Sequence, residues 1–169
     1  VSDAAFRISE DGGATWSKPF IRVDADGNKV GSGAMSIIKL SGKGLGLITN
    51  PRPPGNAHVL FWRSEDEGET WASPVRATPE RASSFVVSTD VMTRTSSGRI
   101  IIPVYVALGF GSRNRFSAVN LPTMWGKIIN GQWTPVSGHF SDSTFTAVFV
   151  VYSDDDGRTW SRNEDGELL

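Results

Sequence analysis

The 169-residue sequence predicts an all-β protein, and three observations support this prediction. Short β-rich runs alternate with turn signals such as Asn-Gly and Ser-Gly-Lys, a pattern typical of chains that fold into many hairpins. No stretch places apolar residues at i, i+3, i+4 and i+7 over three turns, as an amphipathic helix would. The 18 glycines and 9 prolines supply the turns that such a chain needs.

The expected strands are runs rich in β-branched and aromatic residues, each bounded by turn residues. In chain order they are residues 4–8, 20–23, 35–40, 44–49, 57–62, 75–77, 85–94, 99–107, 124–129, 132–136 and 146–152. The clearest hairpin turns at Asn130 and Gly131, the dipeptide that two-residue hairpin loops prefer.

Composition excludes several classes of function. A net charge of −1 lacks the basic footprint of a nucleic-acid binder, and no apolar run approaches the ~20 residues that span a bilayer. The absence of cysteine excludes disulfides, thiolate zinc sites and cysteine nucleophiles. We therefore expect no nucleic-acid partner and no membrane span. Because the sequence begins at Val1, we expect it to start inside a longer protein or after a removed signal segment.

Three octapeptides share the pattern Ser-x-Asp-x-Gly-x-Thr-Trp, at residues 9–16, 64–71 and 153–160. In such a turn the aspartate can accept backbone N–H bonds, the glycine can take a positive φ, and the tryptophan can bury a large apolar face. We therefore expect a structural role and largely buried tryptophans. The residues concerned are Asp11, Gly13, Trp16, Asp66, Gly68, Trp71, Asp155, Gly157 and Trp160.

This octapeptide is the Asp box, or bacterial neuraminidase repeat, and the chain resembles the sialidase (neuraminidase) superfamily of six-bladed β-propellers. Residues 35–43 and 96–104 resemble the innermost hairpins of successive blades, whereas the residues after the third box, 161–163, depart from the family pattern. The resemblance covers nearly the whole chain except an insert at residues 109–144.

The resemblance implies four-stranded antiparallel blades in which each box joins the third and fourth strands. Residues 1–23 would form the outer strands of one blade, 32–78 a second blade, and 85–169 a third blade that carries the insert. Together they make about two and a half blades, whereas a closed propeller needs at least about four. The expected partners are therefore a glycan substrate and the remaining propeller blades of the parent chain.

Strand alternation predicts which loops share an end of the blades. The boxes and the turns at residues 41–43 and 96–98 belong to one end. We expect four longer loops at the other end, at residues 24–34, 50–56, 79–88 and 109–144. Their length and polarity favour a functional role. Four arginines lie in these loops: Arg52, Arg81, Arg113 and Arg115.

The family binds a carboxylated sugar through an arginine cluster, which implies substrate-binding roles for Arg52 and Arg81. Their alternative interpretation is that of solvated loop charges. Asp90, at the head of an innermost strand, is the candidate catalytic carboxylate; it could equally be a satisfied strand-end acid. Tyr152 adjoins a box and Tyr105 lies in a second strand, so neither is a good nucleophile candidate.

The resemblance implies that the parent protein is an exo-sialidase-like glycoside hydrolase acting on terminal sialic acid or a related acidic sugar. It also implies that the parent is secreted or periplasmic and that the reaction needs no cofactor. The Tyr and Glu of that chemistry would lie outside this chain, so we expect the chain alone to be inactive. The alternative is a non-catalytic Asp-box propeller that binds glycan or protein. An independently folded module is a third possibility, disfavoured by the unpaired blade surfaces.

No metal site is predicted. Residues 24–27 and 154–157 are similar to calcium loops, but Arg22 or Tyr152 would then occupy the first ligand position. His58 and His139 are too few and too far apart for a recognisable site.

Overall fold

The computed structural model describes residues 4–31, 33–50, 58–78, 90–108, 126–135 and 145–163. These residues form only strands, bridges and turns, so the predicted all-β class is confirmed for the described part of the chain. The strands are β1 (Ala34–Lys39), β2 (Leu45–Thr49), β3 (Leu60–Ser64), β4 (Val75–Arg76), β5 (Thr93–Arg94), β6 (Ile100–Leu108), β7 (Gly126–Ile129), β8 (Gln132–Pro135), β9 (Phe145–Ser153) and β10 (Ser161–Arg162).

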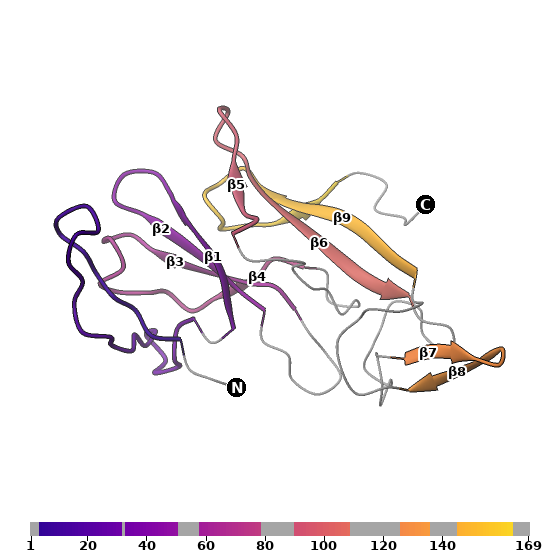
Figure 1. Ribbon diagram of the computed structural model, residues 1–169. Coiled ribbons are helices and arrows are strands. Elements are labelled where there is room, and N and C mark those ends of the chain that lie inside the picture. Colours follow the sequence, from indigo (N-terminus) through magenta and orange to yellow (C-terminus); the bar gives the residue numbers. More distant parts are fainter. Residues whose placement is uncertain are drawn as a thin grey trace.

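Two four-stranded antiparallel sheets organise the chain (Figure 1). The first sheet runs β1-β2-β3-β4 and the second runs β5-β6-β9-β10, so in both sheets chain order equals spatial order. The hairpin β7–β8 lies between β6 and β9 in sequence and stands apart from both sheets in Figure 1. Its turn has positive φ at Asn130 (52°) and Gly131 (78°), as expected for this dipeptide.

Some strands differ from the sequence-based expectation. β10 was not predicted, because Ser161 and Arg162 are exposed and polar and form a strand only by pairing with Tyr152 and Val151. The expected N-terminal strands reduce to isolated bridges, one of which joins Phe6 to Phe20. The run at residues 85–94 reduces to β5 in its described part.

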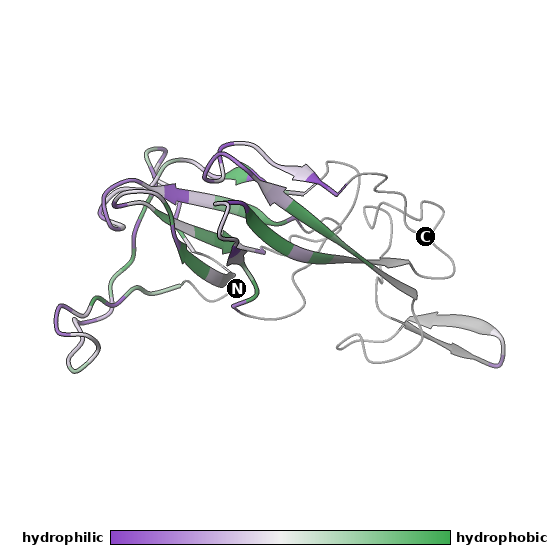
Figure 2. Ribbon diagram, turned by 90° about the horizontal axis from the view of Figure 1, so that it is seen from above, coloured by the Kyte–Doolittle hydropathy of each residue, from purple (hydrophilic) through white to green (hydrophobic). Residues whose placement is uncertain are grey.

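The two sheets pack face to face through a shared apolar core. Ile48 and Phe61 of the first sheet belong to one buried cluster with Ile100, Ile102 and Val151 of the second. Figure 2 shows the apolar residues along the strands and the hydrophilic ones concentrated at turns. Because side chains alternate along a strand, the neighbouring residues of the first sheet point to its other face.

The other face of the first sheet packs on the N-terminal segment, residues 4–31. Leu47 and Trp62 form a second buried cluster with Val30 and Trp71, and Phe6 packs against it. The first sheet is thus packed on both faces, by the second sheet and by the N-terminal segment, although Ile37 of β1 stays 52% exposed.

A close contact ties the third octapeptide to the first sheet. The Phe61 ring lies 5.0 Å from the Trp160 ring, centroid to centroid. A Cβ atom added at Gly157 would overlap the Phe61 ring, so only glycine fits at that position. The turn between β9 and β10 therefore contributes directly to the interface between the sheets.

Candidate functional site

The three octapeptides form the same hydrogen-bond network. In the second, Asp66 Oδ1 accepts from Ser64 Oγ and from the Thr70 amide, both at 2.8 Å, and Asp66 Oδ2 accepts from Thr70 Oγ1 at 2.6 Å. The equivalent bonds to Asp11 and Asp155 measure 2.6–2.9 Å. Each carboxylate thus closes its own turn with local donors.

These donors keep the box carboxyls ionised. The pKa of Asp66 falls to about 2, first because the Thr70 hydroxyl and then because the Thr70 amide bonds the charged form. The pKa of Asp11 also falls to about 2, for the same reasons. Burial acts to raise the pKa of Asp155, but the donors around it outweigh burial and this pKa is again about 2.

The residue before each box glycine has a left-handed backbone, which the sequence pattern did not reveal. Glu67 has φ of 60° and Asp156 of 57°, each followed by a glycine of positive φ. A non-glycine residue rarely adopts this conformation. The dense hydrogen bonding of the turn holds it there.

The three box tryptophans differ in burial. Each indole N–H donates to the carbonyl of its box glycine, at 3.0–3.2 Å. Trp71 is 3% exposed and Trp160 is half-buried, but Trp16 is 54% exposed. The expectation of a buried Trp16 is therefore wrong for this structure, because its box joins only the bridged segments at Phe6 and Phe20 and no sheet of the described residues covers it.

The second and third boxes share one end of the sheets with the first hairpin turns, as predicted. The Glu67 amide donates to the Lys43 carbonyl at 2.9 Å, and Arg99 pairs bidentately with Asp154 at 2.7 and 2.8 Å. Arg94 reaches across to the first sheet, where it donates to Ser41 Oγ at 3.2 Å. We call the two turns, residues 40–44 and 95–98, and the boxes 64–71 and 153–160 the box end.

The opposite end of the first sheet, here the loop end, is formed by Gly33, Ser36, Asn50, His58, Arg76, Thr78 and Asp90. The Asn50 amide donates to the Gly33 carbonyl at 3.0 Å, and Asn50 Nδ2 donates to the His58 carbonyl at 2.8 Å. The Val59 amide donates to Thr78 Oγ1 at 3.2 Å. These bonds tie together the start of β1, the end of β2 and the start of β3.

Asp90 lies at the loop end but not at the head of a strand. It is exposed and has φ of 57°, and β5 begins only at Thr93, so the predicted placement was wrong. A long hydrogen bond, 3.4 Å, joins Ser36 Oγ of β1 to Asp90 Oδ1. Asp90 therefore stands where the first strands of the two sheets adjoin.

A histidine–arginine contact at the loop end was missed by sequence reasoning. His58 Nδ1 lies 2.5 Å from Arg76 Nη2. Burial, and then the positive charge of Arg76, lower the pKa of His58 from 6.5 to about 4. His58 is thus the neutral acceptor of an arginine N–H. The two residues are 18 positions apart, and only the pairing of β3 with β4 brings them together.

Comparison with known protein families agrees with the box geometry. The family model of the BNR/Asp-box repeat matches residues 7–18 and 151–162. The chain carries BNR/Asp-box repeats. Residues 64–71 have the same pattern and the same bonds, and so form a third Asp box. No curated protein matches the chain.

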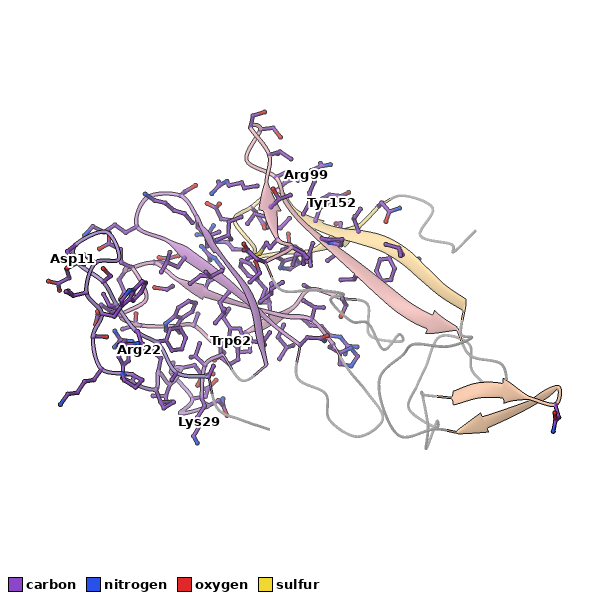
Figure 3. The ribbon with its side chains drawn as sticks, in the orientation of Figure 1. Asp11, Arg22, Lys29, Trp62, Arg99 and Tyr152 are labelled. Carbon is purple, nitrogen blue, oxygen red and sulfur yellow. The ribbon has the colours of Figure 1, made fainter. Side chains whose placement is uncertain are left out.

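The remaining site predictions fall partly outside the described residues. Arg52, Arg81, Arg113 and Arg115 all lie there, so their proximity to Asp90 stays a prediction. Tyr152 lies on β9, where the Arg99 guanidinium carbon sits 4.2 Å from its ring centroid (Figure 3). Within the described residues no cluster of three or more His, Asp or Glu side chains could hold a metal ion, and no helix is long and apolar enough to cross a membrane.

Proposed function

We propose that the chain is part of an exo-sialidase-like glycoside hydrolase that acts on terminal sialic acid or a related acidic sugar. One observation carries the proposal: three Asp boxes with one hydrogen-bond pattern, two of them at the third-to-fourth strand turns of stacked antiparallel sheets. BNR repeats occur in sialidases and related proteins, which makes this class the first to test.

The stacked sheets are, on this proposal, two blades of a six-bladed propeller, with residues 1–23 as the outer strands of a third. Apolar side chains at the two ends of the stack support it. Val148 on the outer face of the second sheet is 66% exposed, and Ile21 of the N-terminal segment is 44% exposed. Further blades of the parent chain would cover these side chains. Because glycans coat cell surfaces, the parent would be secreted or periplasmic.

In this proposal the groups that contact the substrate lie at the loop end. The box carboxylates are occupied by their own turns, whereas the exposed Asp90 makes, within the part of the chain that the structure describes, one long bond to Ser36. In this proposal Asp90 contacts the substrate or orients an arginine, and Arg52 and Arg81 bind the sugar carboxylate through their planar guanidinium groups. The reaction needs no cofactor.

The test is hydrolysis of a fluorogenic sialoside by the intact parent protein. Turnover that falls in Asp90→Asn and in Arg52→Ala, but not in the control Arg7→Ala at the exposed first box, would support the proposal. Binding of sialyllactose without any turnover would instead assign the parent to the non-catalytic Asp-box propellers. The absence of both binding and turnover would refute both assignments.

A further inference from the structure

A cavity of about 490 Å³ opens between the N-terminal segment and the second Asp box. Val23, Asp24 and Ala25 line one side, and Arg63, Glu65 and Glu69 line the other. Its volume lies within the ~300–1,000 Å³ usual for small-molecule sites. Glu65 and Glu69 belong to the second box, so the cavity adjoins the box end. Asp24 and Ala25, which strand alternation assigned to the opposite end, lie beside this box instead.

Arg63 gives this cavity an incompletely bonded donor group. Its side chain is 17% exposed, and its one hydrogen bond within the described residues runs from Nη2 to Glu65 Oε1 at 3.3 Å. The Nε atom is buried without a partner among those residues. A guanidinium has five N–H donors, and buried polar groups are normally bonded. Acceptor oxygens placed in the cavity would bond its free Nη hydrogens.

The acids around the cavity are matched by nearby arginines. Glu65 pairs with Arg63 at 3.3 Å and with Arg158 at 3.4 Å, and Glu69 pairs with Arg22 at 3.0 Å. Of these arginines Arg63 lines the cavity, whereas Arg22 and Arg158 pair with its acids from outside it. With Asp24 included, the three carboxylates are matched by three guanidinium groups in and around the cavity. The balance favours a neutral ligand over an anion or a cation.

Asp24 shapes the wall and is itself saturated. Its carboxylate accepts from the backbone amides of Asp26 and Asn28 and from Asn28 Nδ2, at 2.8–3.3 Å. Glu65 and Glu69, 74% and 63% exposed, retain free lone pairs and can accept from hydroxyl groups.

The cavity also has an apolar side. Val23 is 53% exposed, and Ala25 and Ala72 are exposed beside the buried Trp71. A fitting ligand has one apolar face for these side chains and several hydroxyl groups for Arg63, Glu65 and Glu69. We propose that this cavity binds a neutral hexopyranose unit of a glycan. The site stands independently of the sialidase reaction, since it lies away from Asp90 and takes an uncharged sugar.

The experiment is an NMR titration of the purified, ¹⁵N-labelled chain with the methyl pyranosides of glucose, galactose and mannose. We expect at least one sugar to give saturable shifts of the Arg63 Nε–H and Ala25 amide signals. Glu65→Gln removes the charge of one acceptor and should weaken that binding by about tenfold, which corresponds to the loss of a charge-assisted hydrogen bond.

The repeats provide a matched control. Glu10 occupies in the first box the position of Glu65 in the second, is exposed, and does not line the cavity. Glu10→Gln should leave the affinity unchanged. Ala25→Phe, which fills the cavity from an exposed turn, should abolish the shifts while the far-ultraviolet circular dichroism spectrum stays the same.

Three results would overturn the proposal. The first is the absence of saturable shifts with all three sugars well above the millimolar range. The second is equal weakening by Glu65→Gln and Glu10→Gln. The third is stronger binding of N-acetylneuraminic acid or of a lysine peptide at the same signals, which would assign the cavity to a charged ligand.

Discussion

Trp71 and Trp16 occupy the same position in two Asp boxes and form the same indole hydrogen bond, at 3.0 Å, to their box glycines. They differ in burial, since Trp71 is 3% and Trp16 is 54% exposed. Replacing each with alanine removes the same bond and the same ring. The difference in unfolding free energy between the two variants therefore measures what burial of this residue contributes.

The magnitude follows from the two surroundings. Trp71 belongs to the cluster with Leu47 and Trp62, and its ring centroid lies 6.0 Å from that of Phe6. Its removal leaves an enclosed hole, so Trp71→Ala should cost about 3–5 kcal/mol. The Trp16 ring is already about half exposed, so removing it loses only about half of the free energy of burying such a side chain, and solvent fills the space. Trp16→Ala should therefore cost about 1–2 kcal/mol of unfolding free energy.

Urea unfolding followed by circular dichroism measures both costs on the same chain. The comparison is valid if the two variants keep the slope of the wild-type transition, because a changed slope signals an altered denatured state. Equal costs for Trp71→Ala and Trp16→Ala would refute the reasoning, since the box turn alone would then carry the stabilisation. A larger cost for Trp16→Ala than for Trp71→Ala would also refute it, since the exposed ring would then stabilise the chain more than the buried one.

Three further predictions concern pH, the site and activity. The folded-state pKa of His58, about 4, lies below its unfolded value of 6.5, so stability should be lost as pH falls from 6.5 to 4, and His58→Gln should flatten this part of the unfolding profile. In the parent protein, Asp90→Asn and Arg52→Ala should lower kcat/KM more than tenfold with little change in unfolding midpoint, a loss expected on removing a substrate contact, whereas Asp66→Asn should do the reverse. The 169-residue chain alone should not hydrolyse a fluorogenic sialoside; turnover abolished by a point mutation within it would contradict this.

Local chemistry made much of this fold predictable. The spacing of serine, aspartate, glycine and threonine in each box fixes its bonds within eight residues, so the pattern alone predicted three like turns. Strand alternation likewise predicted that the second and third boxes share an end with the turns at residues 41–43 and 96–98. In both cases the determining contacts are close in sequence or follow from hairpin pairing.

The features that sequence reasoning missed depend on contacts between distant residues. β10 is polar and forms because β9 offers a free edge to Ser161 and Arg162. His58 meets Arg76 only after β3 and β4 pair. Trp16 carries the same motif as Trp71, yet its exposure depends on which strands lie beside it. A repeat therefore predicts the turn, and the packing around the turn must be determined separately.

The hydrogen bonds of the carboxylates indicate that the two ends of the sheets have different roles. A general acid near neutral pH must hold its proton there, and an aspartate with a pKa of about 2, such as Asp66, holds none. Its two oxygens are also committed to Ser64 and Thr70. Among the described residues Asp90 makes one long bond, stands exposed in a left-handed bend, and lies where β1 approaches the segment before β5. A carboxylate that the fold leaves this open can still bind a substrate or an arginine, and for that reason the search for reactive groups belongs at the loop end.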